Sequence, residues 1–286
     1  MKALSEELSF TTEWNQDDRQ ISISQSVHKL NTEENLSYSA IPAYNHAYQE
    51  NYMTDTLDLI LEEAENAYVL LDPNEPSVLE ALPSLKEKEN EVSAYISIGT
   101  GENWRDDFNE LEPYLVAKQW GDWNGEFFVN DVTTGILPLM KKRLDLLAEQ
   151  GFEWVEFDNM DWAFDDVTRE RYNFKVTHEE AIDYYQKLCG YAHSIGLKCM
   201  AKNTTIGSSS FDGVTYESYA SDKNWWDNTE LQTFLDQGKL GLIVHYNDNS
   251  PEKTYNDYLE IYGEHLSFIS ESISSKSYVH FNTTNP

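Results

Sequence analysis

The chain has 286 residues, and 51 acidic residues against 20 lysines and arginines give it a formal net charge of −31. With 40 % hydrophobic and 13 % aromatic residues it can bury a large core, which excludes an acidic disordered chain. The charge also argues against nucleic-acid binding, which needs a basic surface, and no apolar run reaches the roughly 20 residues of a membrane-spanning helix.

Residues 1–35 are polar, and we interpret them as an N-terminal extension. Within them, residues 21–24 alternate between apolar and polar side chains in the manner of a strand. The first ten residues lack the apolar core of a signal peptide. The protein is therefore either cytoplasmic, or its leader lies outside this sequence.

From residue 36 on, short β-branched or aromatic runs alternate with amphipathic helical stretches, the pattern of repeated βα units. We predict eight strands, over residues 36–44, 67–72, 92–99, 154–161, 197–203, 213–218, 240–248 and 277–282. Eight such units predict an α/β fold, a single-domain (β/α)8 TIM barrel over residues 36–286. The alternative is an open doubly wound sheet, but no glycine-rich phosphate turn follows any predicted strand.

The helical stretches lie between the predicted strands. We expect helices over residues 55–66, 77–90, 136–150, 177–195, 229–237 and 252–266. Ser77 and Glu80 have the spacing of a capping box at the second helix. Gly151 and Gly196 follow the helices predicted over residues 136–150 and 177–195, where a left-handed C-terminal residue is expected.

The chain has two cysteines, Cys189 in a predicted helix and Cys199 in a predicted strand. Two cysteines are too few for a disulfide scaffold or a multi-cysteine zinc site. Cysteine is among the residues that are most often buried. We therefore expect two buried free thiols.

Polar and aromatic side chains gather at the carboxyl ends of the predicted strands, the end of a barrel where active sites form. They are Asp72, Glu102, Trp104, Arg105, Asp158, Asn159, Asp161, Lys202, Asn203, Glu217 and Tyr246. We interpret these ends as the candidate site.

Two carboxylates, Asp158 and Glu217, follow strands that are two apart in the predicted barrel, so their ends can face each other across its mouth. Glycoside hydrolysis needs such a pair, one to protonate the leaving oxygen and one to attack or to activate water. Alternatives remain open at this point. Asp158 could cap a turn or, with Asp161, bind a divalent metal, and Glu217 could be an exposed loop acid.

Other side chains also have two interpretations. Six tryptophans in or near the predicted loops could stack on sugar rings or pack in the core: Trp104, Trp120, Trp123, Trp162, Trp225 and Trp226. Lys202 could form a Schiff base if its pKa were depressed, or it could pair with nearby acids, as could Arg105. The net charge could be a solvated acidic surface or a field that attracts a cationic ligand.

Several motifs resemble those of glycoside hydrolase family 114. They are Y-I-S-I-G at 95–99 followed by Glu102, Trp104 and Arg105; W-N-G-E at 123–126; G-F-E leading to D-N-M-D over 151–161; Lys202 with Asn203; and Glu217. The resemblance runs from about residue 67 to 248. It implies an endo-α-1,4-polygalactosaminidase-like TIM barrel.

By this resemblance, Asp158 is the nucleophile of a retaining reaction and Glu217 is the general acid/base. Tyr95, Arg105, Glu126, Asn159, Asp161 and Asn203 then shape the sugar pocket, and we add Asp72, Trp104, Lys202 and Tyr246 from their positions at strand ends. The resemblance implies no cofactor and no metal. It also implies an extracellular or cell-envelope location and a cationic amino-sugar polymer as substrate. We expect a monomer.

The sequence departs from the family pattern at three positions: Phe128 where Trp is common, and Asn130 and Ser218 where Asp is common. These changes leave open another α-linked galactose-type polymer as substrate. Three further hypotheses remain: a catalytically idle glycan-binding barrel, a lyase or aldolase that uses Lys202, and a metal-dependent hydrolase around Asp158 and Asp161.

Overall fold

The computed structural model describes residues 10–15, 20–25, 40–47, 54–121, 123–133, 135–219, 221, 223, 225–271 and 278–282. The chain divides into two compact units, residues 1–36 and 37–286. In the first unit, β1 (Phe10–Asn15) pairs with β2 (Gln20–Gln25) as an antiparallel hairpin. The alternating residues 21–24 lie in β2.

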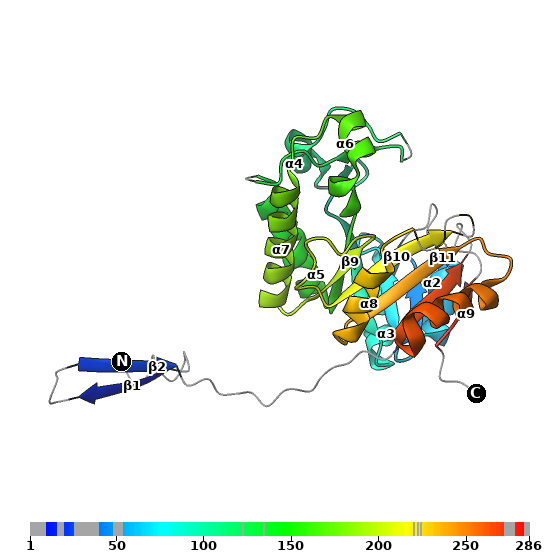
Figure 1. The fold of residues 1–286 in the computed structure, drawn as a ribbon, viewed down its shortest axis with the longest axis horizontal. Helices are drawn as coiled ribbons and strands as arrows, with labels where there is room; N and C mark the ends of the chain where they lie inside the picture. Colours follow the sequence, from blue (N-terminus) through cyan, green and yellow to red (C-terminus); the bar gives the residue numbers. More distant parts are fainter. Residues whose placement is uncertain are drawn as a thin grey trace. The chain divides into compact units, whose positions relative to one another are not determined.

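The second unit is a nearly closed barrel of eight parallel strands with helices outside it, a TIM-barrel fold (Figure 1). In spatial order the parallel strands are β3 (Ala43–Asn45), β4 (Tyr68–Leu71), β5 (Glu91–Ser97), β8 (Trp154–Asp158), β9 (Lys198–Lys202), β10 (Gly213–Tyr219), β11 (Leu240–Tyr246) and β12 (Leu266–Glu271). Two hydrogen bonds join the ends of this sheet. Ile41 N donates to Ser267 Oγ at 3.0 Å, and Asn45 Nδ2 donates to Glu271 Oε1 at 2.9 Å.

Strand side chains alternate between the inside of the barrel and its helical coat, because successive residues of a strand face opposite ways. On β4, Tyr68 and Leu70 belong to the inner apolar cluster, with Trp154 of β8 and Met200 of β9. Val69 belongs to the larger cluster that the helices cover. The barrel interior between these strands is therefore packed with side chains.

The helices follow the strands along the chain. They are α2 (Thr54–Glu63), α3 (Pro76–Glu87), α4 (Phe108–Leu111), α5 (Ile136–Gln150), α6 (Asp166–Tyr172), α7 (His178–Ser194), α8 (Asn228–Asp236) and α9 (Pro251–Tyr262), with 3-10 turns at Glu112–Tyr114, Asp161–Phe164 and Gly263–His265. Gly151 ends α5 with a φ of 95°, as predicted. Among the described residues, none of these helices combines the length and apolarity that a membrane crossing requires.

A small two-stranded antiparallel sheet, which we did not predict, interrupts the βα alternation between β5 and α5. It consists of β6 (Thr100–Glu102) and β7 (Glu126–Phe128). Each strand has three residues, too few for a period-2 pattern to be read from the sequence. The pairing of β6 with β7 brings Glu102 and Glu126 side by side in register.

Four predictions about elements need correction. The eighth barrel strand is β12, not residues 277–282, and α9 ends at Tyr262 rather than at residue 266. β13 (Tyr278–His280) pairs antiparallel with β12, and residue 277 lies outside the described residues. The first strand is only β3, and residues 36–39 also lie outside. The capping box at Ser77 is wrong, because Pro76 already begins α3 after Glu75.

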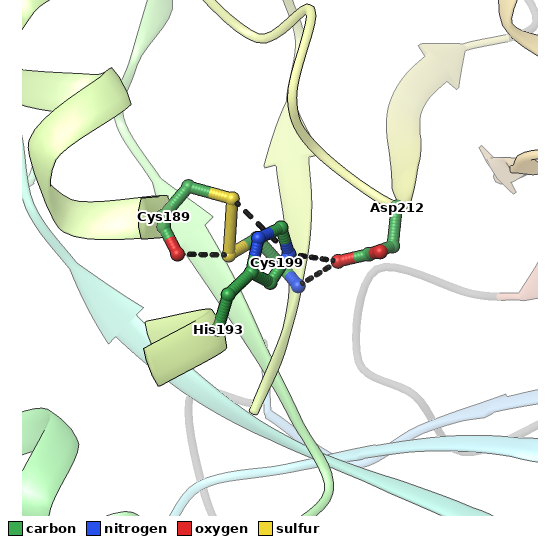
Figure 2. Close-up of side chains that lie close together, drawn as sticks. All are labelled: Cys189, His193, Cys199 and Asp212. Carbon is green, nitrogen blue, oxygen red and sulfur yellow. Dashed lines mark hydrogen bonds and ion pairs between the residues drawn. A yellow bond between two sulfur atoms is a disulfide. The ribbon is translucent and has the colours of Figure 1, made fainter. Parts of the chain in front are cut away.

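The prediction of two free thiols is wrong. Cys189 of α7 and Cys199 of β9 form a disulfide, with their Cα atoms 5.7 Å apart (Figure 2). Both residues are buried, Cys189 on the face of α7 that packs on the barrel and Cys199 on the outward face of β9. This packing brings the two Cα atoms within the usual range for a disulfide, which their ten-residue separation in the sequence did not indicate.

Candidate active site

A cleft of about 310 Å³ opens at the carboxyl ends of the barrel strands. It is lined by Ala47, Tyr95, Glu102, Trp104, Arg105, Trp120, Trp123, Glu126, Asp158, Asn159, Asp161, Lys202, Asn203, Glu217, Tyr219 and Tyr246. Every predicted site residue lines it except Asp72, which lies behind Arg105. The structure thus brings together side chains from β5, the β6–β7 sheet, β8, β9, β10 and β11.

Asp158 and Glu217 share one cation. Lys202 Nζ lies 3.4 Å from Asp158 Oδ1 and 3.5 Å from Glu217 Oε2. Because both oxygens lie within 3.5 Å of one nitrogen, they are at most twice that distance apart. The Lys202 side chain is only 1 % exposed, whereas the two carboxylates are 17 % and 24 % exposed and face the cleft.

Glu217 is also held by neutral hydrogen-bond donors. Tyr246 OH donates to its Oε1 and Asn203 Nδ2 donates to its Oε2, both at 3.0 Å. The amide group of Asn203 is fixed in turn, because its Oδ1 accepts the backbone N–H of Glu217 at 2.9 Å. Two donors from the neighbouring strands β9 and β11 thus set the orientation of this carboxylate.

A third acid, Glu156, lies below the pair inside the barrel. It is fully buried, 3.5 Å from Lys202 Nζ, and its Oε2 accepts a hydrogen bond from Thr215 Oγ1 at 2.7 Å. Burial raises the pKa of Glu156 to about 7, although Lys202 opposes the shift. Burial alone would lower the pKa of Lys202, but the surrounding carboxylates raise it above its usual range. Lys202 therefore stays protonated, which disfavours a Schiff-base role because that chemistry needs a neutral amine.

A second cation lies at the wall of the cleft. Arg105 donates to both oxygens of Asp72 at 2.8 Å and to both oxygens of Glu102 at 2.9 and 3.1 Å. Its side chain is 8 % exposed, and those of Asp72 and Glu102 are 0 % and 4 % exposed. Asp72 therefore acts on the site through Arg105 rather than by touching a ligand.

Two further carboxyl groups in the cleft have strongly raised pKa values. Burial and the neighbouring Asp158 raise the pKa of Asp161 to about 7. Burial and Glu102 raise the pKa of Glu126 to about 8, although Thr100 Oγ1 donates a hydrogen bond to Glu126 Oε2 at 2.8 Å. Near neutral pH, the cleft therefore gains negative charge as the pH rises.

Asparagines follow three of the strands in left-handed backbone conformations: Asn159, Asn203 and Asn247, with φ values of 58°, 57° and 54°. Asparagine tolerates this region better than most residues. The turn at Asn159 points its Nδ2 at Ser97 Oγ, 3.0 Å away on β5. Such turns end a strand abruptly and leave the preceding acid, here Asp158, at the rim.

The tryptophans divide between the cleft and the core. Trp104 and Trp123 are half exposed and line the cleft with Trp120. Trp162 and Trp226 are buried in the core. Trp225 is exposed and donates from Nε1 to the backbone oxygen of Glu217.

The three departures from the family pattern do not line the cleft. Phe128 is buried among Trp120, Tyr172 and Phe174. Asn130 Oδ1 accepts the backbone N–H of Lys175, and Ser218 Oγ bonds Tyr258 OH and His245. These changes therefore adjust packing behind the cleft.

Sequence reasoning missed Glu156 and Tyr219 as parts of the site. Glu156 carried a usable signal, because it shares a strand face with Asp158 two residues later and is the only charged residue within the run W-V-E-F. Tyr219 lies one residue beyond the predicted strand and lines the cleft beside Tyr246.

A barrel whose mouth holds paired carboxylates and exposed aromatic side chains has the arrangement of a glycoside hydrolase. The model of glycoside-hydrolase family GH114 matches residues 38–280, and the chain belongs to this family. No curated protein matches the sequence significantly.

Two solved structures support the fold. One is Ega3 from Aspergillus fumigatus in complex with galactosamine, with 19 % identity over 85 % of this chain and 96 % of that chain and a TM-score of 0.66. The other is the glycoside hydrolase domain of PelA from Pseudomonas aeruginosa, with 14 % identity over 84 % and 98 % of the two chains and a TM-score of 0.59. The expectation of a TIM barrel is confirmed.

Proposed function

We propose that this GH114 protein hydrolyses α-1,4 bonds within a galactosamine-containing polysaccharide and retains the configuration at the anomeric carbon. Asp158 is the nucleophile and Glu217 the general acid/base. The observation that carries the proposal is the single ammonium group of Lys202 between these two carboxylates. The family resemblance of the motifs around them supports the same assignment.

The shared cation suits a two-step reaction. In the first step, Asp158 attacks the anomeric carbon while protonated Glu217 gives its proton to the leaving oxygen. Asp158 becomes a neutral ester and Glu217 becomes a carboxylate, so one negative charge moves from one acid to the other. Because Lys202 is equally near to both, it stabilises that charge before and after the step. Water then attacks the ester, with Glu217 as the base.

The separation of the carboxylates favours retention. Retaining enzymes place the two groups about 5–5.5 Å apart, and inverting enzymes about 6.5–9.5 Å apart. The upper bound set by Lys202 lies below most of the inverting range.

A cationic substrate fits the charge of the cleft. Five acids line it, namely Glu102, Glu126, Asp158, Asp161 and Glu217, against the two cations Arg105 and Lys202, and Asp161 and Glu126 add their negative charge as the pH rises through about 7 and about 8. The whole chain has a formal net charge of −31, and the resulting electric field attracts a polycation. The Ega3 structure, which has a similar fold, was solved with galactosamine.

The test measures reducing-end release from α-1,4-polygalactosamine, its N-acetylated form and polygalacturonate. We expect release from the free-amine polymer, and the rate should fall about 10²–10⁴-fold in Glu217→Gln. Asp158→Asn should fall at least as far. Glu153→Gln, an acid just before β8 that pairs with Lys86 away from the cleft, is the matched control. Near-normal rates in both cleft variants would refute the site assignment, and a product of inverted configuration would refute the nucleophile.

We also propose that the protein acts in the extracellular space or cell envelope. Disulfides persist mainly in oxidising compartments, and the Cys189–Cys199 bond fits such a place. Fractionation of producing cells, with alkylation of free thiols before lysis, tests this. Recovery of the protein in the cytoplasm with both cysteines alkylated would contradict it.

A further inference from the structure

A second cluster of reactive side chains lies away from the cleft. Figure 2 shows its four residues. Cys189 and His193 are one turn apart on α7, Cys199 is near the start of β9, and Asp212 directly precedes β10. The cluster therefore lies near the amino ends of β9 and β10, whereas Lys202 and the active-site acids lie at the carboxyl ends. One sulfur, nitrogen or oxygen atom from each of the four residues lies within 4.8 Å of all the others.

The histidine and the aspartate are already oriented toward the sulfurs. His193 Nε2 lies 2.8 Å from Asp212 Oδ2 and 3.6 Å from Cys189 Sγ. Asp212 is fixed, because its Oδ2 also accepts the backbone N–H of Cys199 at 2.7 Å. The cysteines are buried, but the side chains of His193 and Asp212 are 39 % and 30 % exposed, so an ion can reach the cluster from solvent.

Two sulfurs, one imidazole and one carboxylate form a donor set that zinc accepts. Tetrahedral zinc has Zn–S distances of about 2.3 Å and Zn–N or Zn–O distances of about 2.0–2.2 Å, so its ligand atoms are about 3.3–3.8 Å apart. The distances from His193 Nε2 to Asp212 Oδ2 and to Cys189 Sγ are within about half an ångström of these values. The two bonded sulfurs must separate, and the remaining ligand atoms already lie within 4.8 Å of one another.

We propose that Cys189, His193, Cys199 and Asp212 bind one zinc ion when their disulfide is reduced. Reduction takes two electrons and two protons, which a dithiol supplies as it closes to its own disulfide, and it leaves two cysteine thiols. Zinc then displaces the two thiol protons to solvent and is held by two thiolates, neutral imidazole and carboxylate. The disulfide and the zinc site use the same sulfurs and exclude each other.

Both states tie α7 to β9 at the same point. The reduced protein without metal lacks this link, and there packing and hydrogen bonds such as that from Cys199 Sγ to the backbone oxygen of Cys189 hold the helix on the strand. The redox state and the zinc supply of the surroundings thus decide which link holds α7. This site is independent of the proposed hydrolase function, since none of its residues lines the cleft.

The test uses the full chain, oxidised or reduced with a water-soluble phosphine, which takes up oxygen from water as the cysteines take up the hydrogens. Zinc is titrated against a chromophoric chelator, and cobalt(II) serves as a spectroscopic probe. We expect one tightly bound zinc per chain only after reduction, a thiolate-to-cobalt charge-transfer band, and release of two protons from the thiols.

Variants identify the ligands. His193→Ala should weaken zinc binding about 100-fold, whereas His265→Ala, at another exposed histidine in the turn after α9, should leave it unchanged. Equal zinc affinity of the reduced wild type and the Cys189→Ser/Cys199→Ser variant would overturn the proposal. Unchanged binding in His193→Ala would overturn the four-ligand site as well. Because His193 is partly exposed, its variant is not expected to unfold.

Discussion

Two buried cations line the same cleft, and they are held in different ways. Arg105 makes short contacts to both oxygens of Asp72 and of Glu102. Lys202 has three carboxylates around it, but each lies 3.4–3.5 Å from its nitrogen. Planar guanidinium suits a bidentate, fixed pairing, whereas an ammonium group is a compact charge that several acids can share.

The difference indicates a structural role for Arg105 and a role in the proposed reaction for Lys202. Both oxygens of Asp72 and of Glu102 accept hydrogen bonds from the Arg105 guanidinium. The two acids are almost completely buried, so this cluster stabilises the wall of the cleft. Asp158 and Glu217 are 17 % and 24 % exposed and share the positive charge of Lys202, while the neutral donors Tyr246 and Asn203 orient Glu217. A reactive acid needs a nearby positive charge without a bidentate ion pair that buries it, and the lysine provides this. Four predictions test the distinction.

The largest effect is expected from Lys202→Met, which removes the shared charge and keeps the side-chain volume similar. We expect kcat to fall about 10³-fold, because the charge that moves between Asp158 and Glu217 loses its stabilising partner. Steady-state kinetics on the free-amine polymer measure it. Lys198→Met, at the partly exposed start of the same strand, should retain normal kcat. A fall of less than tenfold would erase the proposed role of the lysine.

Arg105→Gln should chiefly affect folding. It leaves Asp72 and Glu102 buried without their partner, and breaking a buried ion pair in this way costs about 3–5 kcal/mol. Urea unfolding measures the loss. Lys142→Gln breaks an exposed pair with Glu110 and should leave stability almost unchanged. If Arg105→Gln kept full stability and lost kcat as severely as the lysine variant, the two cations would not differ in the way described.

The pH dependence of KM distinguishes the acids beside the two cations. Asp161 and Glu126 lose their protons as the pH rises through about 7 and about 8, respectively. The cleft then gains negative charge, so KM for a polymer that is still protonated should fall several-fold between pH 6 and pH 8. Asp161→Asn should remove the lower part of this fall and Glu126→Gln the upper part. An unchanged slope in both variants would contradict the assignment.

The smallest effect is expected at the aromatic rim beside Arg105. Trp104 is 50 % exposed and lines the cleft, so it can stack on a sugar ring without supporting the fold. Trp104→Ala should raise KM about 2–10-fold with little change in kcat, in line with the strength of a single aromatic contact. Val167→Ala, at a well-exposed apolar side chain on α6, serves as control. A large loss of kcat would place Trp104 in the chemistry rather than at the rim.

The sequence predicted those features of the fold that depend on a single local rule, such as apolar patterning or the preference of a left-handed turn for glycine. Apolar runs such as V-S-A-Y-I-S and L-G-L-I-V-H-Y predicted buried parallel strands, and the acids after them predicted the cleft. Gly151 predicted the end of α5 because a left-handed turn favours glycine. Asp158 and Glu217, which line the cleft, were predicted as candidates because each ends or follows such a run.

The remainder depended on contacts between distant segments. L-S-F-I-S-E directly follows a helix, and only its pairing with β11 identifies it as the eighth strand. The three-residue strands β6 and β7 stabilise each other by pairing, and neither is long enough to show an alternating sequence pattern. The disulfide and the group around Lys202 each join different elements, so their residues could be named, but the partnerships could not.

The short strand β13 has a consequence for the seam of the barrel. β12 would present an open edge where it faces β3, and such an edge invites pairing with another chain. β13 pairs with the last part of that edge, opposite Ile269, Ser270 and Glu271, so the backbone groups of β12 bond there within the same molecule. Pairing of this part of β12 with a strand of a second copy is thereby disfavoured.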